Sequence, residues 1–357
     1  MNSGASPVEK KPDYLQPLSE RSERRVKKEM FRPSGLPSPQ FAISNVIWAE
    51  DGTTSFMLDL QDRELFNRFH YRTLYSLGDS ALVEIYEKHL FGLCFACPFL
   101  MHGSLAVTAV HDRYLGVAPP YRRSLRESYH LSQCTTLFNR WLCQPIKEEH
   151  KDPLWATAGS LAILTFSSIH ACFPEEAWPL GVPDSADLEW LRIGTGKMTL
   201  WNLVNPLRPE SVFRAMSGIF ANMHRPLPKN GTDGVSVELV QLCGLDESST
   251  QENNPYFAVA HSLSRLLAAS KGEAPQGAVI QVLRHMHDEF GTRLGEKDPV
   301  ALLLLCLWYT RARASKWWID IRARYELPAI CTYLQRYHSG DSIIQALIPW
   351  DEIKVLV

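Results

Sequence analysis

Apolar residues recur at helical spacing from about Asp62 onward, and this pattern restricts the folds that the chain can adopt. One set comprises Leu82, Ile85, Tyr86, His89, Leu90 and Leu93, and a second comprises Val279, Val282, Leu283, Met286, Phe290 and Leu294. Residues three, four and seven positions apart share one face of an α-helix, so each set predicts a helical stretch with a buried side. Strand signals are sparse after residue 60. We therefore expect an all-α fold, a large multi-helix domain.

Proline that follows a polar residue marks several expected helix starts. Asp152-Pro153 and Asp298-Pro299 each offer an N-cap carboxylate, followed by a residue whose missing N–H costs nothing in the first turn. Pro98 and Pro119-Pro120 are further candidates for helix starts. Residues 235–239 alternate between apolar and polar side chains, which leaves a short strand and a short helix both open.

The first sixty residues differ in composition from the rest. Residues 1–40 hold six prolines and few large apolar residues. Such a composition cannot bury enough surface to order a chain, so we expect a disordered tail there and a helical domain over residues 41–357. The basic stretch between Arg21 and Lys28 favours either a nuclear-import signal or a solvated turn. Asp51-Gly52 separates two short apolar runs, which predicts one small N-terminal β-hairpin.

Composition excludes several classes of protein. The 357 residues are 45% hydrophobic and 21% charged, as in ordinary globular proteins. The formal net charge is −2, so the chain as a whole lacks the basic surface that nucleic acid binding requires. No secretory segment opens the chain, and no apolar run reaches the roughly 20 residues of a membrane span. Most of the eight cysteines lie in apolar segments. We expect an intracellular protein of the nucleus or cytoplasm, without a membrane span and not secreted.

No motif predicts a metal site, a cofactor or a catalytic centre. A structural zinc site needs four ligands, so we interpret the single close pair Cys94 and Cys97 as two buried thiols. His285 and His287 are two residues apart and would point to different sides of a helix, which favours surface positions over a shared metal. The two histidines of the apolar segment around residue 105 are expected to be hydrogen-bonded core residues. The sequence thus favours a non-enzymatic role without establishing it.

Large aromatic side chains are frequent in the C-terminal part of the chain, which holds several of the ten tryptophans. They approach one another only if the C-terminal helices pack together. One interpretation is core packing by large side chains, and the other is the wall of an apolar ligand cavity enclosed by helices. The candidate ligand-binding residues are Phe257, His261, Leu305, Trp308 and Trp317.

A series of motifs follows in a fixed order along the chain. Residues 97–106 read CPFLMHGSLA, with His111 nine positions after His102. The later segments are DPLWAT at 152–157, AWPL at 177–180, DLEWL at 187–191 with Gly196-Lys197, KDPVALL at 297–303, and Trp317-Trp318. In order and spacing these segments resemble the regulatory domain of fungal zinc-cluster transcription factors similar to the sterol-uptake-control regulators. The resemblance extends over roughly residues 62–335.

The resemblance implies an all-helical regulatory domain that binds an apolar small molecule such as a sterol, and that pairs with itself or with a full-length regulator. Members of the family carry an N-terminal six-cysteine zinc cluster that binds DNA, whereas residues 1–40 contain no cysteine. We therefore expect a transcription-regulator-like domain without direct sequence-specific DNA binding. Two alternatives stay open: a metal-independent enzyme of specialised metabolism with an enclosed helical pocket, and a pure protein-interaction module that acts as a dominant-negative partner.

Overall fold

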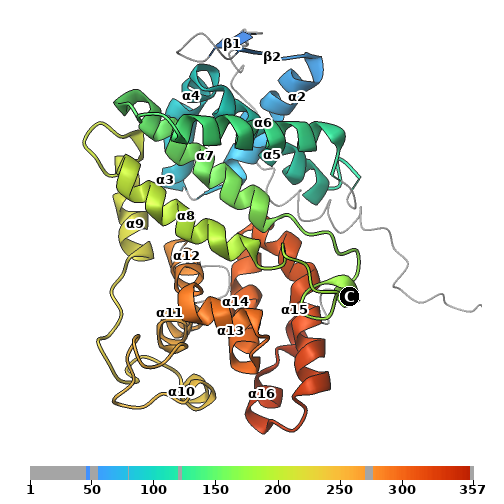
Figure 1. Ribbon diagram of the computed structural model, residues 1–357, viewed down its shortest axis with the longest axis vertical. Coiled ribbons are helices and arrows are strands. Elements are labelled where there is room, and N and C mark those ends of the chain that lie inside the picture. The colour runs from blue at the N-terminus through green and yellow to red at the C-terminus, as the bar shows by residue number, and fades with distance from the viewer. Residues whose placement is uncertain (1–45, 49–54, 79, 120–122, 270–275, 354–357) are drawn as a thin grey trace, which may run out of the picture.

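A computed structural model of the chain describes residues 46–48, 55–78, 80–119, 123–269 and 276–353. The fold is all-α, as the sequence predicts, with one small antiparallel hairpin near its N-terminal end (Figure 1). Strand β1 (Val46–Trp48) pairs with β2 (Ser55–Met57), and Ile47 lies opposite Phe56. This confirms the predicted hairpin, although its Asp51-Gly52 turn lies outside the described residues. The expected tail at 1–40, with its basic stretch, lies outside them as well.

The N-terminal half of the described chain forms the upper layers in Figure 1. Its helices are α2 (Leu60–Arg68), α3 (Ser80–Ile85), α4 (Phe91–Ala96), α5 (Pro98–Tyr114), α6 (Leu125–Leu142), α7 (Glu148–Phe166) and α8 (Glu189–Val204), with the short turns η2 (Phe69–Thr73), η3 (Leu74–Ser76), η4 (Tyr86–Leu90) and η5 (Pro174–Glu176). Helix α5 is buried along most of its length because α2, α4, α6 and α7 all pack against it.

Most elements of the C-terminal half lie below these layers in Figure 1. It comprises η6 (Val212–Met216), α9 (Ser217–Met223), α10 (Val237–Cys243), α11 (Phe257–Ala268), α12 (Gln276–His285), α13 (Asp288–Gly295), α14 (Pro299–Ser315), α15 (Trp317–Tyr337), α16 (Ser342–Leu347) and α17 (Trp350–Ile353). Helix α14 is central to this half, since α11, α12, α13, α15 and α16 contact it. Among the described residues, no helix is both long and apolar enough to cross a lipid bilayer.

Two hydrophobic cores lie on either side of α5 and α7. Phe99 and Leu154 belong to the core of the N-terminal half, whereas Val107 and Leu164 belong to the core of the C-terminal half. These two helices therefore contribute side chains to both cores. Burial of apolar surface on both sides of them is the main force that holds the halves together.

Two of the expected helix starts are confirmed and one is wrong. Helix α14 begins as predicted, because the Asp298 side chain accepts a hydrogen bond from the Ala301 N–H. Helix α5 also begins as predicted, at Pro98. The prediction for Asp152 is wrong, since α7 begins four residues earlier, at Glu148. The Asp152 carboxylate instead accepts hydrogen bonds from the segment at residues 211–212. A contact distant in sequence thus replaces the local cap.

The helical spacing over residues 279–294 gives the correct buried face but conceals a break. Helix α12 ends at His285 and α13 begins at Asp288, whose φ is +52°. The expected surface position of His285 is wrong. Its ring is half-buried, with Nδ1 3.2 Å from the Ser262 hydroxyl. The ambiguous stretch at 235–239 enters α10, where the Ser236 hydroxyl accepts a hydrogen bond from the Leu239 N–H.

Candidate functional site

The five candidate ligand-binding residues lie in or against the C-terminal core. Phe257 and His261 are one turn apart on α11, with ring centroids 4.3 Å apart. Leu305 and Trp308 lie on α14, which packs against α11. Trp317 begins α15 and contacts the N-terminal half instead. Its ring stacks on that of His111 at 4.7 Å, and its Nε1 donates to the Ser76 hydroxyl at 3.0 Å.

These side chains are closely packed. Phe257, Leu305 and Trp308 are all 0% exposed, and Trp308 Nε1 donates to the Val279 carbonyl at 3.0 Å. The contacts are those of a packed core. Neither of the two open hollows described below is lined by any of the five residues. Their role in ligand binding stays a prediction.

A distinctive group of polar side chains lies where α2, α5 and α6 meet. His130 Nε2 lies 3.0 Å from Oδ1 of Asp62, and His130 Nδ1 lies 2.9 Å from Nδ1 of His102. Arg126 forms ion pairs with Asp62 and, at 2.8 Å, with Asp59. We call these five residues, Asp59, Asp62, His102, Arg126 and His130, the relay cluster. Their side chains are thereby joined in one continuous series of contacts that ends at His102.

Local sequence positions each member of the relay cluster. Asp59 caps α2 by accepting from the Asp62 N–H at 2.8 Å, and the Asp62 side chain reaches back to the Asp59 N–H, which makes a capping box. Arg126 and His130 are four positions apart on α6 and therefore share one face of that helix. Hydrogen bonds thus hold the carboxylates at the start of α2, where they meet both α6 side chains.

Burial determines the protonation of the two histidines. Desolvation, aided by the neighbouring His130, lowers the pKa of His102 to about 3. Desolvation also lowers the pKa of His130, although the Asp62 carboxylate opposes the shift. Both rings are therefore neutral at pH 7.

The order of donors and acceptors then follows. Because the Asp62 carboxylate accepts the Nε2–H of His130, Nδ1 of His130 must accept the Nδ1–H of His102. Nε2 of His102 is left as an acceptor, and within the described ranges no side chain donates to it. A base with a pKa near 3 is a weak proton acceptor at neutral pH, so this arrangement does not favour general base catalysis.

An open hollow of about 590 Å³ adjoins the relay cluster, and we call it the hairpin hollow. It is lined by Phe56, Met57, Asp59, Gln61, Asp62, Leu125, Arg126 and Tyr129. The Phe56 ring centroid lies 4.2 Å from that of His102, and the Tyr129 ring lies 5.8 Å from the same imidazole. The rings that line the hollow therefore also cover the last member of the relay cluster.

Several large apolar side chains at the rim of the hairpin hollow are exposed. Met57 is 70% exposed, Leu125 is 92% exposed and Tyr129 is 48% exposed. Leu60, next to Gln61 in the sequence, is 73% exposed. Single exposed apolar residues are common, but a group of them around one hollow is typical of a binding surface.

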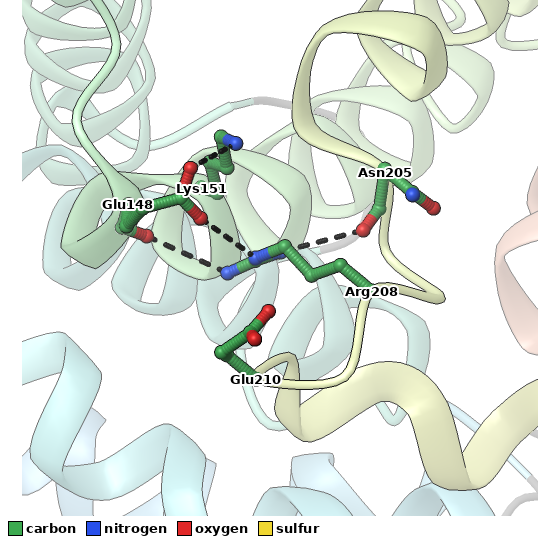
Figure 2. A pocket seen from close by; sticks show the side chains of 5 residues that line it. All are labelled: Glu148, Lys151, Asn205, Arg208 and Glu210. Carbon is green, nitrogen blue, oxygen red and sulfur yellow. Dashed lines mark hydrogen bonds and ion pairs between the residues drawn. The ribbon is translucent and has the colours of Figure 1, made fainter.

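A second open hollow, of about 470 Å³, is polar (Figure 2). In Figure 2, Arg208 extends toward Glu148, which also pairs with Lys151. Arg208 Nη2 lies 2.9 Å from Oδ1 of Asp152. The charges of this hollow are thus largely satisfied by one another. They tie the start of α7 to the residues that follow α8.

The expected core positions of several reactive residues are confirmed. Cys94 and Cys97 are buried, and Cys94 Sγ lies 3.4 Å from the Ser104 hydroxyl. His111 is buried with Nδ1 3.0 Å from the Thr73 hydroxyl. In the part of the chain that the structure describes, no three His, Cys, Asp or Glu side chains are grouped to hold a metal ion.

Comparison with known proteins adds no relative to these observations. A scan of the chain against protein-family models finds no match, and a search among curated proteins finds no similar sequence. The hairpin hollow and the relay cluster were not predicted from sequence, because Asp62 lies 64 positions from Arg126 and 68 from His130. The one local signal was the spacing of Asp59 and Asp62, which is that of a capping box.

Proposed function

We propose that this chain is a helical regulatory domain of the transcription-regulator type that acts by binding another protein at the hairpin hollow. The observation that carries the proposal is the exposed apolar rim above a charged floor held in place by hydrogen bonds. Centres of protein interfaces are enriched in Tyr, Met and Arg, and Tyr129, Met57 and Arg126 all line this hollow. The resemblance to fungal zinc-cluster regulators supports a regulatory role in the nucleus or cytoplasm.

The charge of the floor indicates the chemistry of the partner. Two carboxylates, of Asp59 and Asp62, face one guanidinium, that of Arg126, while the histidines beneath are neutral. The Asp59 side chain is about half exposed, so it can accept a further donor. A partner segment with apolar side chains and a lysine or arginine fits both the rim and the floor.

Variants of the rim test the proposal. Leu125→Ser combined with Tyr129→Ala removes apolar surface without touching a hydrogen bond of the relay cluster. Val182→Ser is the matched control, because Val182 is 91% exposed and lies outside the hollow. Proteins cross-linked to the wild type in cells are quantified by mass spectrometry, together with the transcript profile. We expect the double variant to lose at least one partner that the control retains, and to change transcript levels. Identical partners and transcripts for all three proteins would contradict the proposal.

Binding of a sterol-like molecule in the C-terminal core is the second part of the proposal. It is supported by the aromatic side chains Phe257 and Trp308, which the fold brings into one core. Extraction of the purified protein followed by lipid mass spectrometry tests it. We expect a recovered lipid and a melting temperature that rises with added sterol. If neither is found, the domain is an interaction module alone, either for a full-length regulator or for a second copy of itself.

A further inference from the structure

The hairpin hollow adjoins the point where the first 45 residues join the helical domain. Strand β1 begins at Val46, which pairs with Met57, and Met57 lines the hollow. Because β1 and β2 are antiparallel, the N-terminal end of β1 is the end at which β2 continues into Asp59 and Leu60. Strands β1 and β2 and helix α2 lie together at one end of the molecule (Figure 1). The chain before Val46 is thereby attached next to the hollow.

One part of these 45 residues combines positive charge with large apolar side chains. We call residues 21–32, RSERRVKKEMFR, the basic segment. It holds six arginines and lysines and two glutamates, a net charge of +4, although the whole chain has a net charge of −2. Val26, Met30 and Phe31 lie within it. This composition is the one deduced above for a partner of the hollow.

The lining of the hairpin hollow has the opposite charge. Its charged residues are Asp59, Asp62 and Arg126, which leaves one negative charge in excess. Asp62 is buried and bound by Arg126 and His130, whereas the Asp59 side chain is 54% exposed. The hydrogen bond from Arg126 lowers the pKa of Asp59, so this carboxylate is ionised at pH 7. A lysine or arginine of the basic segment can therefore pair with Asp59.

The apolar side chains of the two parts match as well. An exposed ion pair contributes little to binding by itself, so the match depends on apolar surface. Met57 and Leu125 at the rim are 70% and 92% exposed. Contact with Met30 and Phe31 withdraws apolar surface of both parts from water. A purely basic run of residues would offer the hollow charge but nothing for its rim.

The connection between the two parts is short. Thirteen residues, 33–45, separate the basic segment from Val46, and they reach at most about 45 Å when fully extended. A segment on a tether of this length has an effective concentration on the order of 1 mM at a site within its reach. A separate protein lacks this advantage, so it must bind the hollow more tightly than the segment does in order to displace it.

We propose that the basic segment binds the hairpin hollow of its own chain and competes there with the partner protein. Binding within the chain follows from charge, apolar surface and attachment alone, whereas the competition rests on the proposed function. The hollow is then open to a partner only when the basic segment is displaced. The segment is thus an autoinhibitory contact for the same surface.

Photo-cross-linking in the full chain tests the contact. The photoreactive residue p-benzoylphenylalanine replaces Leu125, whose side chain is almost fully exposed, and in the control protein it replaces the equally exposed Val182. Peptide mass spectrometry locates the cross-links, with isotopically heavy and light chains mixed in equal amounts. We expect cross-links from position 125 to residues 21–32 of the same chain, and none to them from position 182. Absence of these cross-links, or products that join heavy to light chains, overturns the proposal.

Variants of the basic segment identify what it contributes. We expect Met30→Ser combined with Phe31→Ser to lower the cross-link yield about tenfold, because these side chains supply the apolar half of the contact. Leu15→Ser combined with Leu18→Ser is the matched control, since it removes two large apolar residues from outside the segment. An unchanged yield in the first variant, or an equal loss in the control, overturns the assignment to residues 21–32.

Capture of partners in cells separates this inference from the proposed function. We expect the Met30 and Phe31 double variant to capture more of the partner than the wild type does, because competition at the hollow is relieved. Equal capture by both proteins overturns the competition but leaves the proposed function standing. A cross-link to the basic segment, together with no captured partner in any variant, contradicts the proposed function and supports binding within the chain.

Discussion

Nδ1 of His102 lies 2.9 Å from Nδ1 of His130, a separation that requires one ring to donate and the other to accept. Two protonated imidazoles could not make this contact, because both nitrogens would be donors. The Asp62 carboxylate decides which ring donates, since it takes the Nε2–H of His130. The protonation states of the two rings, their orientation and the packing of α5 against α6 are therefore linked through this one pair of nitrogens.

Replacement of His130 by Phe tests this linkage. The variant keeps a ring of similar size but leaves the Nδ1–H of His102 without a partner, whereas Oδ1 of Asp62 keeps its hydrogen bond from Arg126. An unsatisfied buried donor costs about 1–3 kcal/mol, so we expect the free energy of unfolding to fall by about 1–3 kcal/mol. Urea denaturation measures it. His89 is exposed, and His89→Phe should change stability by less than about 0.5 kcal/mol. Equal stabilities of the two variants would show that the contact is unimportant.

Stability should fall as the pH is lowered below about 6.5, the ordinary pKa of histidine. Burial lowers the pKa of His102 and of His111 to about 3, and that of His285 to about 4. Between these values and 6.5 the unfolded chain binds protons that the folded chain does not, so acid favours unfolding. Each histidine adds a slope of about 1.4 kcal/mol per pH unit, and above pH 6.5 the contribution is constant.

Urea denaturation at pH 7, 6 and 5 measures this slope. The His285→Asn variant removes one titrating ring, so its stability should depend less steeply on pH than that of the wild type. The exposed carboxylates with lowered pKa, such as Glu84, act only below about pH 4.5 and leave this window unaffected. A stability that is constant between pH 7 and 5 would be incompatible with neutral buried histidines.

Features that depend on local sequence were predictable, whereas those that depend on distant contacts were not. The helical class and the cap at Asp298 follow from neighbours within four residues. The start of α7 was missed because Asp152 binds residues about 60 positions away. The relay cluster was missed for the same reason. The sequence predicts a hydrogen-bonded core position for His102 but not its partner, because Asp62 and His130 meet only in the fold.

Cysteine reactivity should follow burial in the folded protein. Burial raises the pKa of Cys94, Cys134 and Cys243 to about 12, which suppresses the reactive thiolate. Cys143 is exposed and Cys172 is half-buried. We expect iodoacetamide to label Cys143 first, then Cys172, and the six buried cysteines only after denaturation. Peptide mass spectrometry after timed labelling measures the order, and early labelling of Cys94 would contradict the packing around it.

Arg322 on α15 connects the two halves of the molecule through buried hydrogen bonds. Its Nε donates to the Phe166 carbonyl at 2.7 Å, and its Nη2 donates to that of Ser168 at 2.8 Å, both at the end of α7. Its Nη1 donates to Glu326, which also accepts from the Tyr309 hydroxyl at 2.6 Å. The guanidinium is therefore both the neutralising charge for Glu326 and the link between α15 and α7.

Replacing Arg322 by Met should be among the most destabilising single changes in the described chain. It leaves the buried Glu326 carboxylate without a cation, and loss of one partner of a buried pair costs about 3–5 kcal/mol. Adding Glu326→Gln to the same chain removes this unpaired charge, and the glutamine side chain can still accept the hydrogen bond of the Tyr309 hydroxyl. We expect the double variant to lose at least about 1 kcal/mol less stability than the sum of the two single variants. A double-mutant cycle in urea measures this difference, and additivity within about 0.5 kcal/mol would show that the pair does not couple α15 to α7 through its charge.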